Sequence, residues 1–123
     1  MANTIVAIDD EESIRRLVKL ALEAEGYICH IAANGEEGLR KIREVNPDLV
    51  LCDVMMAKMD GFEVVDAMRK DPKLKETVIV MLSARDKELG TLDGRKDPPE
   101  VNEYLSKPFD LKELLAVVKK YLG

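Results

Sequence analysis

Residues 49–53 read Leu-Val-Leu-Cys-Asp, four apolar residues followed by a single carboxylate. A short apolar run without polar alternation is typical of a central strand in a parallel sheet, because helices cover both faces of such a strand. Three other apolar runs also end in polar residues, before Asp9-Asp10, before Ser83 and before Lys107-Pro108. The carboxyl ends of parallel strands share one edge of a sheet, so we expect three acids, a hydroxyl and an ammonium group to meet there.

Strand-like and helix-like segments alternate along the rest of the chain. The predicted strands cover residues 5–8, 27–32, 49–52, 78–82 and 101–106. Apolar residues at helical spacing follow the first, second, third and fifth of these strands. Three of the helices begin at an acid or amide, Asn34, Asp60 or Asp110, with Glu three positions later, which is the pattern of a capping box. Glycines and consecutive prolines interrupt residues 84–100, so we expect the fourth helix to be short or irregular.

This alternation predicts an α/β fold. Right-handed crossovers between successive strands give a doubly wound, five-stranded parallel sheet with helices on both faces. The chain has 123 residues, which suits one domain spanning residues 1–123. In such a domain the functional crevice lies outside the carboxyl ends of the strands, where the polar residues are expected.

The composition excludes several classes of protein. No apolar stretch approaches the ~20 residues that a membrane span requires. The net charge is -5 and basic residues are interspersed with acidic ones, so this domain is not expected to bind nucleic acid directly. The N-terminus lacks the basic start and apolar stretch of a secretory signal, and a cytoplasmic location is therefore expected.

The acids at the expected sheet edge predict a metal site. Taken singly, Asp9 or Asp10 is explained as a helix cap, but capping does not explain why Asp53 should lie beside them. Crowded carboxylates repel one another unless a cation joins them, and Mg²⁺ is the hard cation that carboxylates, a carbonyl and waters usually hold. Such a site is suited to phosphoryl transfer, with Asp53 as the nucleophile and Lys107 and Ser83 neutralising phosphoryl oxygens.

Taken together, the motifs resemble the receiver domain of two-component response regulators over essentially the whole chain. They are Asp9-Asp10-Glu11, Asp53-Val-Met-Met, Asp60-Gly61, Ser83-Ala84-Arg85 and Lys107-Pro108-Phe109. The resemblance implies a flavodoxin-like sheet with the strand order 2-1-3-4-5. It also implies a signalling phosphoacceptor, which at most catalyses the phosphorylation and dephosphorylation of its own aspartate.

The resemblance further implies which residues accept the phosphoryl group and hold the metal. Asp53 is expected to take a phosphoryl group from the phosphohistidine of a sensor histidine kinase or a histidine phosphotransfer protein. Asp10, Asp53 and the backbone carbonyl of Met55 are expected to hold Mg²⁺, and Asp9 to act on it through water.

Three residues are implied in the response to phosphorylation. Lys107 is expected to pair with a phosphoryl oxygen, and its bond to Pro108 to be a cis peptide. Ser83 is expected to move toward the phosphate while Tyr104 rotates inward into the vacated space. This change would control an output domain or a target protein, and a phosphorylation-dependent dimer is a further expectation.

The sequence departs from the family pattern in two places. Ala57 stands where the family commonly has proline, in the loop that follows Asp53. Residues 90–101 lack the usual sequence of the fourth helix and the Gly-Ala pair before the fifth strand. The second departure falls on the face that receivers usually present to their output partner.

Three alternatives stay open at the level of the sequence. A degenerate receiver would share the fold and bind partners without phosphorylation. A phosphatase of the haloacid-dehalogenase type also uses an aspartate at a strand end, but it needs a second acid two residues later, where this chain has Met55. A flavin-binding module needs a phosphate-cradling loop after the first strand, where Asp9 and Asp10 would repel an anion.

Overall fold

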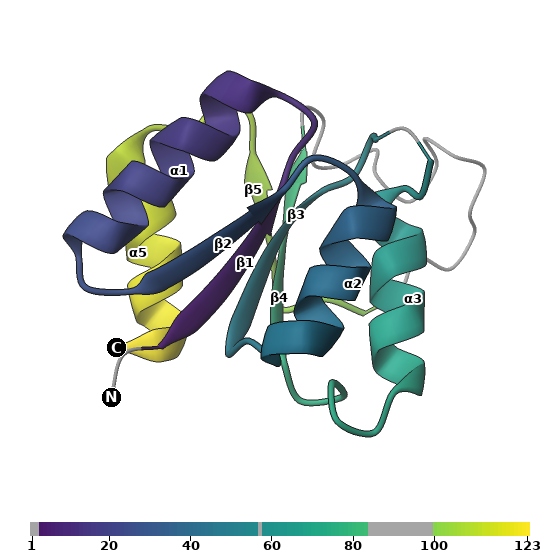
Figure 1. The fold of residues 1–123 in the computed structure, drawn as a ribbon. Helices are drawn as coiled ribbons and strands as arrows, with labels where there is room; N and C mark the ends of the chain where they lie inside the picture. Colours follow the sequence, from purple (N-terminus) through teal and green to yellow (C-terminus); the bar gives the residue numbers. More distant parts are fainter. Residues whose placement is uncertain (1–2, 57, 84–99) are drawn as a thin grey trace.

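The computed structural model describes residues 3–56, 58–83 and 100–123. Its elements are β1 (Thr4–Ile8), α1 (Glu12–Ala24), β2 (Ile28–Ala32), α2 (Gly35–Val45), β3 (Leu49–Asp53), α3 (Gly61–Lys70), β4 (Val78–Ser83), β5 (Glu103–Ser106) and α5 (Leu111–Leu122). The strands form one parallel sheet in the order β2-β1-β3-β4-β5, and helices cover both of its faces (Figure 1). The predicted fold and strand order are confirmed, whereas the predicted fourth helix lies outside the described residues.

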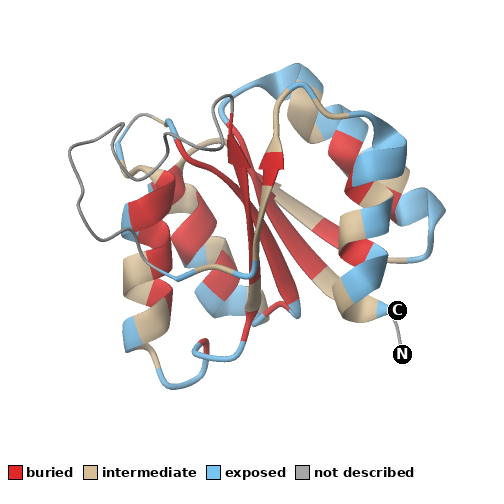
Figure 2. Ribbon diagram, turned by 180° about the vertical axis from the view of Figure 1, so that it is seen from behind, coloured by how far each residue is buried: buried red, intermediate tan, exposed pale blue. Residues whose placement is uncertain are grey.

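The centre of the sheet is apolar on both sides. All five residues of β3 are buried, and its side chains alternate between two hydrophobic clusters. Val50 and Cys52 face the cluster under α2 and α3, whereas Leu49 and Leu51 face the cluster under α1 and α5. Figure 2 shows this buried centre between exposed outer helix faces. An unbroken apolar run was therefore the correct signal for a strand covered on both faces.

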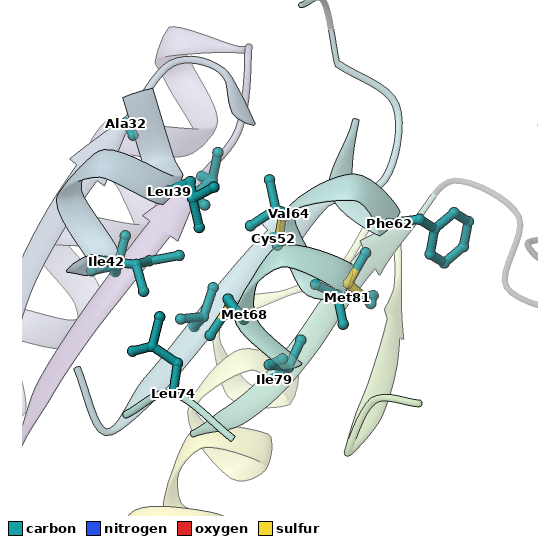
Figure 3. Packing of buried hydrophobic residues seen from close by; sticks show 14 of the residues in the cluster. Ala32, Leu39, Ile42, Cys52, Phe62, Val64, Met68, Leu74, Ile79 and Met81 are labelled. Atoms are coloured by element: carbon teal, nitrogen blue, oxygen red, sulfur yellow. The ribbon is translucent and has the colours of Figure 1, made fainter. Parts of the chain in front are cut away.

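The cluster under α2 and α3 is built from both helices and from the strands below them. Its fully buried members include Ile42, Phe62, Val64, Met68, Leu74, Ile79 and Met81 (Figure 3). Cys52 also belongs to it as a free thiol, and burial raises its pKa well above the ordinary range. This cysteine is therefore a packing residue with little thiolate character. No helix within the described ranges has the length and apolar character needed to cross a membrane.

Three helices begin at side-chain caps. Asp60 and Asp110 form complete capping boxes with the Glu three residues later. The side chain of Asn34 accepts a hydrogen bond from the backbone N–H of Glu37 at 2.8 Å, but the predicted reciprocal bond, from the Asn34 N–H to the Glu37 carboxylate, is not formed in α2. The N-cap of α1 is Glu11, whose side chain makes no capping bond. The loop before α1 therefore needs another form of support.

β5 begins two residues later than predicted. Asn102 donates its backbone N–H to the carbonyl of Ile79, but its side-chain oxygen accepts the N–H of Ile79 at 2.8 Å. A side chain thus replaces the backbone at the start of this ladder, and regular pairing begins at Glu103 opposite Val80. Sequence periodicity carries no sign of such a replacement, because Asn is read there as an ordinary loop or strand residue.

The cap of α5 gives a test of this description of the fold. Asp110→Ala removes the acceptor that satisfies the Glu113 N–H at 2.8 Å, so the free energy of unfolding should fall by about 1 kcal/mol. Urea denaturation followed by circular dichroism measures the change. Lys112→Ala, an exposed substitution in the same helical turn, should leave stability within about 0.5 kcal/mol. Equal losses in the two variants would contradict the role of the cap.

Candidate phosphoacceptor and metal site

The carboxyl ends of four strands meet at one edge of the sheet. Asp53 is the last residue of β3, and Ser83 is the last residue of the adjacent β4. Asp9 directly follows β1, and Lys107 directly follows β5. Parallel pairing places these positions side by side, since Asp53 lies opposite Leu82 and Ser83 lies opposite Ser106. The structure thus brings together the side chains that the sequence predicted to converge.

Three carboxylates form the centre of this edge. Asp9, Asp10 and Asp53 each offer an oxygen, and these oxygens all lie within 4.8 Å of one another. Asp9 and Asp53 are buried, whereas Asp10 is exposed and marks the open side of the cluster. Negative charges held this close and partly out of water require compensation.

Lys107 supplies part of that compensation. Its Nζ lies 2.7 Å from Asp9 Oδ2 and 3.4 Å from Asp53 Oδ2. Its backbone N–H donates to the carbonyl of Ser83 at 2.6 Å, and the Lys107–Pro108 peptide is cis, as the family resemblance implied. Burial favours a lower pKa for Lys107, but its close contact with Asp9 and the charges of Asp53 and Asp9 hold that pKa above its ordinary value. The ammonium group therefore stays charged within the cluster.

The pKa of Asp53 is also raised, but here burial contributes to the increase. Burial and the neighbouring Asp9 charge raise the pKa of Asp53 from 3.8 to about 6, although Lys107 counteracts them. The carboxylate is mostly ionised at neutral pH but is held there at a cost. A further positive charge beside it would relieve that cost.

The residues of the cluster fit a divalent cation. Asp9 Oδ2 is buried and makes no hydrogen bond of good geometry, and its close contact within the described chain is the Lys107 ammonium. Three carboxylates against one ammonium leave two formal negative charges. The donors are all oxygens, which is the set that Mg²⁺ or another hard cation prefers. A magnesium ion would therefore match both the charge and the ligand chemistry of this edge.

The loop after Asp53 is anchored at its base. The N–H of Val54 donates to Leu82 at 3.1 Å, and the N–H of Gly61 donates back to Val54 at 2.9 Å. A Cβ at Gly61 would lie 2.4 Å from the carbonyl oxygen of Asp53, so only glycine fits against the backbone of that residue. Met55 lies in this loop with 60% of its surface exposed, whereas Ala57 lies outside the described residues.

Comparisons with known proteins identify the family to which this arrangement belongs. The sequence profile of the response regulator receiver domain matches residues 5–119. The chain belongs to this family. The transcriptional regulatory protein SrrA of Staphylococcus aureus is 37% identical over 122 residues, which are 99% of this chain and 48% of SrrA. The chain thus spans about half the length of the curated relatives it matches.

Solved receiver structures share the fold closely. The chemotaxis response regulator CheY4 of Vibrio cholerae has a TM-score of 0.85 and 33% identity, covering 98% of this chain and 99% of CheY4. The response regulator TrrA of Thermotoga maritima, solved in complex with Mg²⁺ and BeF, has a TM-score of 0.80 and 38% identity, covering 97% of this chain and 98% of TrrA. Receiver domains are signalling phosphoacceptors and not classical enzymes, so the expectation of a non-enzymatic signalling role agrees with the family.

Ser83 and Tyr104, which the receiver resemblance assigns to the switch, lie on neighbouring strands. Ser83 is buried at the end of β4, with 2% of its surface exposed. Tyr104 lies in β5 opposite Met81 and packs, half-buried, against the cluster under α2 and α3. Burial raises the pKa of its hydroxyl, so the ring is neutral at physiological pH. Tyr104 is thus placed on the strand that leads directly to Lys107.

Sequence reasoning missed two supports of this receiver site. Gly61 was read as part of a motif, but its close approach to the Asp53 carbonyl was not foreseen. Arg15 was not singled out at all, yet its guanidinium donates to the carbonyl of Asp9 at 2.8 Å. The chain carries a second arginine at the next position, Arg16, and helical spacing alone does not show which of the two turns toward the site.

The raised pKa of Asp53 predicts how stability depends on pH. Between pH 3.8 and about 6 the folded state binds more protons than the unfolded state, so stability should fall as the pH rises through this window. Asp53→Asn removes the charge. In metal-free buffer at pH 7 the variant should be more stable than the native chain by about 1–2 kcal/mol, allowing for solvent screening. Urea titrations from pH 4 to pH 7.5 should show this gap closing toward pH 4.

Asp71→Asn is the matched control, since it changes a carboxylate at the far end of α3. It should show no gain in stability at pH 7. If Asp53→Asn were as stable as the native chain at every pH, the ionised carboxylate would carry no folding penalty.

Proposed function

We propose that residues 1–123 form one receiver domain, in which Asp53 accepts a phosphoryl group from a phosphohistidine. The observation that carries this proposal is the position of Asp53, buried at a strand end between a lysine and two further carboxylates. A carboxylate placed in this way has little use in packing. It has the charge, the partners and the access on the Asp10 side that a nucleophile in phosphoryl transfer requires.

The chemistry requires only one bond to form and one to break. An oxygen of Asp53 forms a bond to phosphorus while the phosphorus–nitrogen bond of the donor imidazole breaks, and the imidazole retains the electron pair. The pKa of about 6 keeps most of Asp53 ionised at neutral pH, so no base is needed to remove a proton. Lys107 already lies within 3.4 Å of that carboxylate and is placed to pair with a transferred phosphoryl oxygen.

Mg²⁺ is part of the proposal. Asp10, Asp53 and the backbone carbonyl of Met55 would hold the ion, and Asp9 would act on it through water. When bound, the ion neutralises the charge that collects on the oxygens of the transferring phosphoryl group. The relative TrrA was solved in complex with the same ion, which supports the assignment.

Phosphorylation would then act as a switch. Ser83 is proposed to move toward the phosphate and Tyr104 to rotate inward from its half-buried position on β5. The bond between the Lys107 N–H and the Ser83 carbonyl links the two strand ends that would move. A charge placed on Asp53 would thus alter contacts on β4 and β5 together.

The proposal includes a phosphodonor and an output partner. A sensor histidine kinase or histidine phosphotransfer protein would supply the phosphoryl group, in the cytoplasm. An output domain or a separate target would read the phosphorylated state, and a dimer that depends on phosphorylation is part of the same proposal. The curated relative SrrA is a transcriptional regulator about twice as long as this chain, which supports an output beyond the receiver. The domain is also proposed to catalyse its own aspartate phosphorylation and dephosphorylation.

The alternatives fit the site less well. A haloacid-dehalogenase phosphatase needs a second acid at the position of Met55, and the family match is to receivers. A flavin phosphate would meet Asp9 and Asp10 at the end of β1. A degenerate receiver would have no need to keep acceptor, acids, lysine and serine together, as this chain does.

Asp53 gives the direct test. The protein is incubated with a small-molecule phosphodonor, with Mg²⁺ or with excess chelator, and its intact mass is read promptly. We expect one phosphoryl adduct that depends on Mg²⁺ and is lost in Asp53→Asn. Asp71→Asn should be labelled like the native chain. Labelling of Asp53→Asn at the native rate would move the acceptor elsewhere, and no adduct together with no spectral response to beryllofluoride would favour the degenerate receiver.

Lys107 gives a second test, of the switch. Lys107→Ala should still bind Mg²⁺ but should lose the structural change that follows phosphorylation, because the link between the phosphoryl group and β5 is gone. Amide chemical shifts recorded with and without beryllofluoride measure that change. Lys112→Ala is the control and should respond like the native chain. A native response from Lys107→Ala would contradict the assigned role.

A further inference from the structure

We propose that Arg15 is a positioning residue of the acid site and sets its affinity for Mg²⁺. Its guanidinium Nη1 donates to the backbone carbonyl of Asp9 at 2.8 Å, which fixes the turn that carries Asp9 and Asp10. This inference rests on the proposed function, because it takes the acid cluster to be the place where a divalent cation binds. Arg15 does not touch the reacting atoms and acts only through the two acids.

The helix α1 lacks the side-chain cap with which the other described helices begin. α2, α3 and α5 each begin at a side-chain cap, whereas Glu11 at the start of α1 makes no such bond. Asp9, two residues before Glu11, is engaged within the turn and at the site. Asp9 Oδ1 accepts the N–H of Glu11 at 3.0 Å, and Asp9 Oδ2 lies against Lys107. The carboxylate of Asp9 therefore supports the turn and the site, and no described side chain caps α1.

Arg15 replaces the missing cap with a tether from inside the helix. It stands in the first turn of α1, half-buried, and reaches back six positions to Asp9. Asp9 is thereby held on every side: its N–H donates to Ala32 at 3.2 Å, its carboxylate is engaged as above, and its carbonyl accepts from Arg15. Among these contacts of Asp9, the bond from Arg15 links the turn to α1 through a helix side chain.

The tether matters most for Asp10. The carbonyl of Asp9 belongs to the peptide group that joins Asp9 to Asp10, so fixing its oxygen fixes the plane from which Asp10 departs. Across residues 3–56, 58–83 and 100–123 no hydrogen bond or ion pair holds the exposed carboxylate of Asp10 itself. Arg15 provides one of the contacts that hold the backbone from which this carboxylate projects, beside the bonds to Ala32 and Glu11. Supports of this kind commonly set metal affinity by holding ligands in place.

The neighbouring Arg16 provides a matched comparison within the same helix. Arg16 pairs with Glu12 at 3.0 Å, with 75% of its side chain exposed. Exposed pairs of this kind contribute little to stability. The two arginines are adjacent in the same helix and share their charge, and they differ in what the guanidinium contacts.

The test measures Mg²⁺ affinity directly in Arg15→Met and Arg16→Met. Amide shifts of residues around Asp10 are followed by NMR during titration with MgCl₂, and the unfolding midpoint is recorded in metal-free buffer. Arg15→Met should bind Mg²⁺ about tenfold more weakly than the native chain. Arg16→Met should match the native affinity within twofold. Arg15→Lys keeps one donor on a shorter reach and should lie between Arg15→Met and the native chain.

The outcomes separate this inference from the proposed function. Native Mg²⁺ affinity in Arg15→Met, with or without a lower unfolding midpoint, would overturn the inference and leave the proposed function standing. Failure of the native chain to bind Mg²⁺ would overturn both. If Arg15→Met does not fold, Arg15→Lys decides: a several-fold loss of affinity supports the positioning role, and native affinity contradicts it.

Discussion

The ammonium of Lys107 lies between two buried carboxylates, and the arrangement of the acid site depends on that contact. The residue follows β5, its backbone bonds to the end of β4, and its Nζ lies 2.7 Å from Asp9 and 3.4 Å from Asp53. One side chain and one peptide N–H thus connect the carboxyl ends of four strands. Without that charge, two buried acids would face each other uncompensated, at a cost of several kcal/mol. The two carboxylates can stay buried at this edge because the Lys107 ammonium compensates their charge.

The position of the site follows from the way the sheet is covered. Helices pack on both faces of β1 and β3, so a polar group within these strands would be buried without partners. The strand ends are the places where the chain can turn acids toward water while keeping them anchored. The same constraint explains why Asp53 is held by its backbone against Gly61, on the loop that leaves the edge. Stability is supplied by the centre of the sheet, and chemistry is confined to its edge.

Much of the fold could be predicted from the sequence because its signals are local. The bounds of β3 and β4 were predicted to within one residue, since an apolar run and its polar end were both visible. The strand order came only from the family resemblance, because no local pattern fixes which strands are neighbours. The start of β5 was misplaced because Asn102 pairs through its side chain. The convergence of the acids followed from topology, whereas the tether from Arg15 depends on the direction of one side chain and left no pattern to read.

The loop after Asp53 has a hydrogen-bonded base and an exposed outer side. The bond from Gly61 to Val54 closes the loop at its base, next to Asp53, while Met55 and Lys58 lie exposed on its outer side. Substitutions on that outer side alter what a visiting protein meets without displacing the carboxylate at the base. The contacts at the base of this short loop and the side chains on its outer side are therefore separate features. The outer side chains can therefore change in size and charge while the base of the loop keeps its hydrogen bonds.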